Sequence, residues 1–168
     1  MASKILQMTG TYMVNATELV SELQQMRDDG FLSDALLRHT VKTIAGADDR
    51  AHWVGAFLVR EGGEGLWLHN YIGEPSQFAE IEAGNGLWGA AASAGSNRNV
   101  PDVTVEEDYT TCGPDIRSEL VVLIRGGSDV FGGINLGSED GSAFNEEDEA
   151  AVQAVTDKLA EQIALERR

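Results

Sequence analysis

The sequence predicts an α+β fold with a central antiparallel sheet of about five to six strands and helices on both faces. Three observations predict it: helical patterns at both ends, two hairpin patterns with glycine-containing turns between them, and one strand that is apolar on both faces. That strand, residues 52–60, alternates Trp53 and Phe57 with Val54 and Ala56. Such a strand is typical of the middle of a covered sheet. The terminal helices are therefore expected on one face, and the segment 81–117 with its small-residue helix on the other.

Helical patterns occupy both ends of the chain. Residues 14–29 predict a first helix, because Asn15 can cap it and Glu18 follows at capping-box spacing. Gly30 ends it, and a second helix is expected from Ser33 to about Gly46. A last helix is expected over about residues 146–165, with acidic residues suited to its positive N-terminal end.

Two hairpins are expected between the helices. The first joins residues 52–60 and 66–72 through the turn 61–65, and the second joins 120–124 and 130–136. Gly132-Gly133 predicts a bulge or a close approach of another backbone. A glycine turn over residues 84–86 is expected to open a small-residue helix over 87–94. Residues 100–103 are expected at an edge of the sheet, because Pro101 has no backbone N–H to donate to a neighbouring strand.

Length and charge exclude several classes of function. The 168 residues predict one domain, with 1–32 as an N-terminal extension and helix and 33–165 as the core. A net charge of −16 repels phosphate backbones and anionic lipids, so we expect no nucleic-acid or membrane partner. The acidity fits ordinary solubility, a salt-adapted source or a basic partner. A single cysteine, no signal peptide and no long apolar run predict a cytoplasmic location.

Common catalytic patterns do not occur in the sequence. Its three histidines have no second metal ligand at helical spacing, so no metal is expected. The glycine turn 84–89 lacks the lysine of a phosphate-binding loop, and no serine lies in a nucleophile elbow. Cys112 stands apart, because it lies in the polar loop 108–115 ahead of Arg117. A nearby guanidinium could lower its pKa, although a lone cysteine is usually a small buried hydrophobe.

The order of these landmarks resembles that of the GAF family, whose members are small antiparallel-sheet modules that enclose a ligand. The resemblance rests on Trp53-Val-Gly-Ala-Phe-Leu, Gly84-Asn-Gly-Leu-Trp-Gly, Tyr109-Thr-Thr-Cys, Arg117-Ser-Glu-Leu and Val130-Phe-Gly-Gly-Ile-Asn. Within that family, residues 53–159 resemble the free methionine-(R)-sulfoxide reductases. Cyclic nucleotides and bilins are ligands elsewhere in the family, but no basic residue suits a phosphate and no histidine adjoins Cys112. No cofactor is expected.

The reductase resemblance implies roles for particular positions. It places the attacking thiol at Cys112 and a substrate-holding carboxylate at Glu119. The resolving cysteine falls on Trp88, and a further family cysteine falls on Phe78. The two substrate-holding aspartates fall on Asn135 and Gly137. The resemblance therefore predicts that the fold is kept and the reductase chemistry is lost.

The remaining polar and aromatic residues suit a binding pocket under the segment 81–117. Asn135 is the most informative, because a polar side chain in an apolar strand needs a partner when it is buried. Aromatic side chains offer flat surfaces with a polar tip, and carboxyl and amide groups offer hydrogen bonds. The predicted ligand-binding residues are Trp53, Tyr71, Trp88, Asp102, Tyr109, Glu119 and Asn135.

The leading functional hypothesis is a stand-alone, cytoplasmic small-molecule sensor with an unknown ligand. It would signal through a partner or as a homodimer formed by its terminal helices, using the stripes Leu19/Leu23/Met26 and Val152/Val155/Leu159. One alternative is a one-cysteine methionine sulfoxide reductase that uses Cys112 and an external thiol. Another is a degenerate scaffold that binds only protein.

Overall fold

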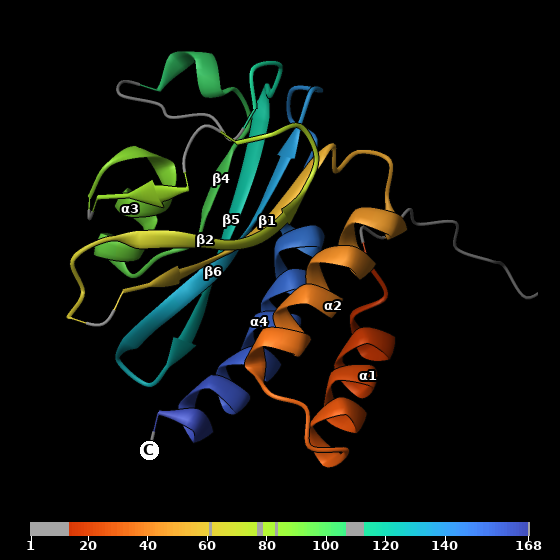
Figure 1. Ribbon diagram of the computed structural model, residues 1–168. Coiled ribbons are helices and arrows are strands. Elements are labelled where there is room, and N and C mark those ends of the chain that lie inside the picture. The colour runs from red at the N-terminus through yellow and green to blue at the C-terminus, as the bar shows by residue number, and fades with distance from the viewer. Residues whose placement is uncertain (1–13, 61, 77–78, 83, 107–112, 168) are drawn as a thin grey trace, which may run out of the picture.

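The computed structural model describes residues 14–60, 62–76, 79–82, 84–106 and 113–167 (Figure 1). Tyr109 and Cys112, two predicted site residues, lie outside the described residues, as does Phe78. None of the helices in these ranges is both long and apolar enough to cross a bilayer. The elements are α1 (Ala16–Asp28), α2 (Ser33–Ala47), β1 (Trp53–Val59), β2 (Leu66–Ile72), β3 (Glu80–Ile81), α3 (Gly86–Ala94), β4 (Arg98–Val100), a 3-10 turn (Val103–Val105), β5 (Ser118–Gly126), β6 (Asp129–Ser138) and α4 (Glu146–Glu166).

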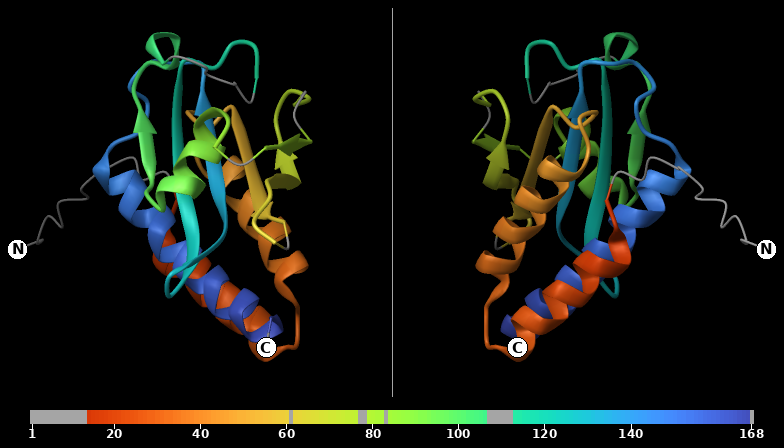
Figure 2. Two further views of the ribbon diagram at one scale, coloured as in Figure 1. Left: turned by 90° about the vertical axis from the view of Figure 1, so that its left-hand side faces the viewer. Right: turned by 90° about the vertical axis from the view of Figure 1, so that its right-hand side faces the viewer.

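The described strands form one antiparallel sheet of six, in the order β3-β2-β1-β6-β5-β4. β1 lies inside the sheet between β2 and β6, as its two apolar faces predict. α2 and α4 cover one face, and α1 packs on α4 and α2 (Figures 1 and 2). α3 lies against β5 and β6 on the opposite face. The predicted α+β fold with helices on both faces is therefore confirmed.

Each face of the sheet carries its own hydrophobic core. Val54 and Ala56 of β1 join the larger core beneath α1, α2 and α4. Trp53 and Phe57, which alternate with them, join the smaller core beneath α3. Because side chains along a strand alternate between its two faces, β1 contributes side chains to both cores.

The apolar stripes of the terminal helices are used inside the molecule. Leu19, Leu23, Val152, Val155 and Leu159 are at most 1% exposed and belong to the larger core, with Met26 packed against it. They are therefore not available to a second chain. A homodimer would need a different surface.

Several element boundaries differ from the prediction. The edge strand β4 ends at Val100, before Pro101, and Val103 begins a 3-10 turn instead. The predicted irregularity at Gly132 is present: Ile124 pairs with Gly132 and Arg125 with Val130, so the register of β5 and β6 shifts beside Gly132 and skips Phe131. Gly132 also allows the close approach of another backbone, because a Cβ there would clash with the carbonyl oxygen of Phe57 on β1.

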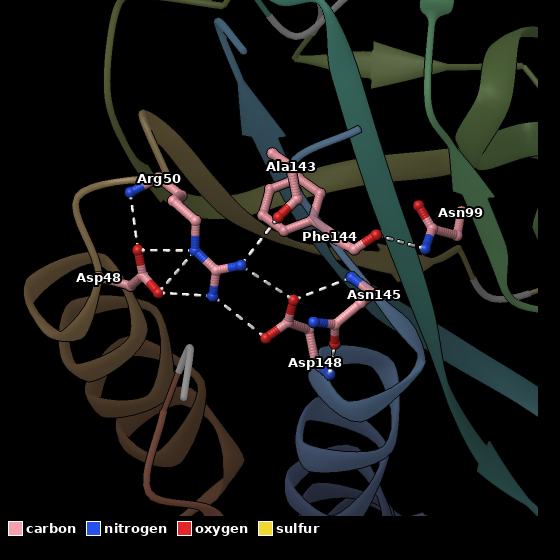
Figure 3. A network of polar contacts seen from close by, with 7 residues as sticks. All are labelled: Asp48, Arg50, Asn99, Ala143, Phe144, Asn145 and Asp148. Carbon is pink, nitrogen blue, oxygen red and sulfur yellow. Dashed lines mark hydrogen bonds and ion pairs between the residues drawn. The ribbon is translucent and has the colours of Figure 1, made fainter. Parts of the chain in front are cut away.

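A polar network holds the start of α4 against the end of α2 (Figure 3). Arg50 donates hydrogen bonds to Asp48, to Asp148 and to the carbonyl oxygen of Ala143, at distances from 2.7 to 3.2 Å. Burial alone would raise the pKa of Asp48, but the hydrogen bonds from Arg50 outweigh it and hold that pKa below its ordinary value. Asn145 caps α4 and completes a capping box with Asp148.

Candidate functional site

Glu119 is a buried carboxyl group in the middle of the sheet. It lies on β5 and is 0% exposed. Val121 and Leu123, which follow it on the same side of the strand, belong to the core beneath α3. Across the strand pair, Glu119 lies opposite Gly137 of β6, and Asn135 is the diagonal neighbour. The sequence thus places two polar side chains side by side on an otherwise apolar face.

Two side chains donate hydrogen bonds to the same oxygen of Glu119. Trp88 Nε1 of α3 lies 3.0 Å from Glu119 Oε1, and Asn135 Nδ2 lies 2.6 Å from it. Burial raises the pKa of Glu119 to about 8, and the hydrogen bonds from Asn135 and Trp88 oppose this only in part. The neutral acid is therefore the main form at pH 7.

Asn135 has one hydrogen-bonding group left over. Its Oδ1 is buried and has no hydrogen-bond partner, a state shared among the described side chains only by Thr40 Oγ1. An unsatisfied buried polar atom costs roughly 1–3 kcal/mol. Thr40 lies on α2, on the other face of the sheet, and is not a predicted site residue. Asn135 lies on the α3 side, next to Glu119, and is one of the predicted site residues. Its Oδ1 can accept a hydrogen bond that the described chain does not supply.

A layer of aromatic rings extends from Trp88, which contacts this polar pair. Trp88 stacks on Phe57 with ring centroids 5.1 Å apart, and its centroid lies 5.6 Å from that of Trp53. Tyr71 of β2 stacks on Trp53 at 5.5 Å. Trp53 leans across Gly55, where a Cβ would clash with its ring. The glycine therefore lets the indole lie flat on the sheet.

The structure brings together most of the predicted ligand-binding residues that lie within the described ranges. Trp88, Glu119 and Asn135 are linked by hydrogen bonds, and Trp53 and Tyr71 join them through ring contacts. Asp102 is the exception. Its carboxylate accepts two hydrogen bonds from Thr104, through the backbone nitrogen at 3.0 Å and the hydroxyl at 2.6 Å. These bonds lower the pKa of Asp102, which caps the 3-10 turn.

Phe57 was not among the predicted site residues, although it forms part of the aromatic layer. A signal for it exists in the sequence, because Trp53, Gly55 and Phe57 occupy alternate positions of one strand and so share a face. A glycine between two large aromatic residues on one face leaves room for a ring to lie across it. The pattern therefore favours a layer of flat rings against the sheet.

A narrow crevice opens beside Trp53, where the chain runs from Gly113 to Ile116. Its volume is about 20 Å³, and its lining residues include Glu74, Asp115 and Glu139 but no lysine or arginine. A crevice of this charge disfavours anions. Two larger hollows lie elsewhere: one of about 270 Å³ beneath the β1–β2 and β5–β6 turns, and one of about 510 Å³ between the starts of α1 and α4.

The comparisons with known proteins agree with this architecture. The family model of the GAF domain matches residues 33–164. The chain belongs to the GAF domain family. Within the described ranges, no group of three or more histidine, cysteine or carboxylate side chains could hold a metal ion. The polar pair Glu119 and Asn135 on the α3 side of this GAF sheet is where the predicted site residues meet.

The chain is also similar to three individual proteins. It is similar to protein YtsP of Bacillus subtilis, at 25% identity over 79% of this chain and 76% of that protein. It is also similar to the type II free methionine-R-sulfoxide reductase of Thermoplasma acidophilum, with 27% identity, a TM-score of 0.74 and coverage of 79% and 93%. The free methionine-R-sulfoxide reductase of Neisseria meningitidis, solved with its substrate, gives 25% identity, a TM-score of 0.81 and 90% coverage of both chains.

Proposed function

We propose that this GAF domain is a small-molecule sensor that binds its ligand on the α3 side of the sheet, against Trp53, Trp88, Glu119 and Asn135. The observation that carries the proposal is Asn135 Oδ1, a buried acceptor without a partner beside a buried carboxyl group. A folded protein retains such a group at a cost, and a ligand that supplies the missing donor removes that cost. The ligand would therefore present an N–H or O–H group to Asn135.

The surroundings of Asn135 narrow the chemistry of that ligand. The rings of Trp53 and Trp88, which are tilted by 34° to each other, provide apolar surface that suits an aliphatic or planar body next to the donor group. Acidic residues are among those that line the crevice at Trp53, which favours neutral or cationic molecules over anions. A small amine or amide with an apolar body fits these features. A cytoplasmic location and a downstream signalling partner belong to the same proposal.

Thermal melts against a panel of amino acids, methionine sulfoxides, nucleotides and small anions test the proposal. A ligand at about 100 times its dissociation constant adds about 2.7 kcal/mol of stability, which raises Tm by several degrees at this size. The matched variants are Asn135→Ala and Asn99→Ala. Asn99 also donates one side-chain hydrogen bond, to the carbonyl oxygen of Phe144 at 3.0 Å, but it lies on the edge strand β4.

We expect Asn135→Ala to weaken binding about tenfold, the equivalent of about 1.4 kcal/mol for one buried hydrogen bond. Asn99→Ala should leave the affinity unchanged, even if it lowers Tm. If no compound shifts the melt, or if both variants bind like the wild type, the proposed site is wrong. A protein-binding scaffold would then be the better account.

A one-cysteine reductase is the second candidate, favoured by the two reductases at 25% and 27% identity. In that reaction the Cys112 thiolate would attack the sulfoxide sulfur, methionine would leave, and the oxygen would remain on the cysteine as a sulfenic acid. Two equivalents of an external thiol would then return the cysteine to its thiol, releasing water and one disulfide. Trp88 supplies no resolving thiol, and its indole already donates to Glu119.

Turnover of free methionine sulfoxide with a thiol reductant separates the two candidates. The reductase requires turnover in the wild type and its loss in Cys112→Ser, whereas the sensor requires ligand binding that Cys112→Ser leaves intact. Absence of turnover in the wild type would end the reductase hypothesis.

A further inference from the structure

The polar pair of Glu119 and Asn135 is closed to solvent in this structure. Both side chains are 0% exposed, and the unpartnered Oδ1 of Asn135 is itself buried. A ligand can form a hydrogen bond with a buried atom only after a neighbouring side chain has moved aside. The proposed binding therefore requires a second arrangement of the site, in which one side chain has left its place.

Among the described residues, Trp88 meets this requirement best. Its Nε1 donates to Glu119 Oε1 at 3.0 Å, and its ring lies 5.1 Å from that of Phe57 at an angle of 8° between the planes. Glu119, Asn135 and Phe57 lie on β5, β6 and β1, three neighbouring strands inside the sheet. Trp88 lies on α3, a helix of nine residues outside the sheet (Figure 1). It can therefore move without breaking hydrogen bonds between strands.

The two ends of α3 are compatible with such a movement. Gly86 at its start and Gly95 after its last residue have φ angles of 62° and 65°. Glycine adopts this backbone region without a steric penalty, and residues at the ends of an element commonly absorb the dihedral changes when a segment moves. A rotation of α3 that lifts the indole of Trp88 from Glu119 is therefore sterically accessible.

We propose that Trp88 is a built-in occupant of the ligand site, and that the ligand is a planar aromatic compound with a ring N–H that takes the place of its indole. The inference rests on the proposed sensor function and names the class of ligand. Such a compound would stack on Phe57 and donate to Glu119 Oε1, as the indole does, with Trp53 as a second wall. A second N–H on the compound would satisfy Asn135 Oδ1.

Removal of the indole should leave a space that free indole fills. The probes are indole and 1-methylindole, which has the same rings but no N–H. We expect calorimetric titration of Trp88→Ala to give a dissociation constant for indole on the order of 0.1–1 mM. 1-Methylindole should bind about tenfold more weakly, because Glu119 Oε1 then lacks a donor. Trp67→Ala is the matched control, since Trp67 is 39% exposed and its ring contacts that of His69.

Trp88→Phe tests the same point in a variant that keeps a ring against Phe57. Phenylalanine can stack there but cannot donate to Glu119 Oε1, so the closed arrangement loses one buried hydrogen bond. Indole should therefore bind Trp88→Phe about tenfold more tightly than it binds the wild type. A circular dichroism melt of each variant verifies that it folds.

The wild type can report the displacement directly, because the chain has only three tryptophans. Each gives one Nε1–H signal in a nitrogen-15 NMR spectrum, and Trp88→Phe identifies the signal of Trp88. When indole is added, that signal should shift and exchange with water faster, as its hydrogen bond to Glu119 is lost. The signal of Trp67 should stay in place.

Two results would overturn the inference. Trp88→Ala could bind indole no better than Trp67→Ala does, or bind 1-methylindole equally well, in which case the indole of Trp88 does not stand in for a ligand. Alternatively, a compound could bind the wild type and depend on Asn135 while the Trp88 signal stays unchanged. The proposed function would then stand and only the displacement of Trp88 would be wrong. The proposed function itself fails on a different observation, namely that no compound in the thermal panel binds the wild type.

Discussion

Ionisation of Glu119 should make the stability of this domain fall as pH rises from 5 to 8. Burial raises the pKa of Glu119 from 4.5 to about 8, so the folded chain holds a proton there that the unfolded chain releases above pH 4.5. In that interval the unfolded state binds one proton fewer, and the free energy of unfolding drops by about 1.4 kcal/mol per pH unit. Over the whole window the loss is on the order of 5 kcal/mol.

Glu119→Gln isolates this contribution. The glutamine keeps an acceptor for Trp88 Nε1 and Asn135 Nδ2 but cannot ionise. Burial also lowers the pKa of His69, whose charge partner Asp34 opposes the shift. That histidine adds stability as pH rises through about 6.5, so only the difference between wild type and variant reports on Glu119.

Urea unfolding of both proteins at half-unit steps from pH 5 to 8.5 provides the assay. The free energy of unfolding of the wild type, relative to that of Glu119→Gln, should decline steadily with pH and level off above about 8. Parallel curves for the two proteins would refute the reasoning, because they would mean that Glu119 ionises in the folded chain as it does in water.

Two further predictions concern the scaffold. Arg50→Met removes the cation between two buried carboxylates and should cost about 3–5 kcal/mol in urea unfolding; a loss below about 1 kcal/mol would show that those carboxylates tolerate burial unpaired. Gly132→Ala should destabilise the sheet strongly, because the new Cβ would clash with the carbonyl oxygen of Phe57. Gly46→Ala should instead stabilise α2 by roughly 0.5–1 kcal/mol, because no atom lies within 4 Å of the position of the new Cβ. Equal effects of the two substitutions on Tm would contradict the close approach of β1 and β6.

Much of the fold could be predicted because local patterns and tertiary packing agree. The spacing of apolar residues in 16–28 and 146–166 predicts helices, which the structure contains. The apolar side chains on both faces of β1 predict that it lies inside the sheet, between two other strands. β3 could not be foreseen, because a two-residue strand exists only through its pairing with Leu66 and Trp67 of β2. Such a short segment has no period of its own.

The candidate site was less predictable than the fold. Asn135 is predicted because a buried amide in an apolar strand needs a partner, and Glu119 because the family resemblance implies a carboxylate at that position. Neither argument shows that the two side chains share a hydrogen bond, which depends on the register of β5 and β6. Asp102 is predicted as a site residue from its residue type alone. In the fold, its side chain caps the 3-10 turn instead.

A crystal structure of the domain with the compound that gives the largest thermal shift tests the central claim most directly. The account predicts a donor atom of the ligand at about 2.7–3.2 Å from Asn135 Oδ1, with its body against Trp53 or Trp88. A ligand bound in one of the two larger hollows instead, with Asn135 Oδ1 still unpartnered, would contradict it.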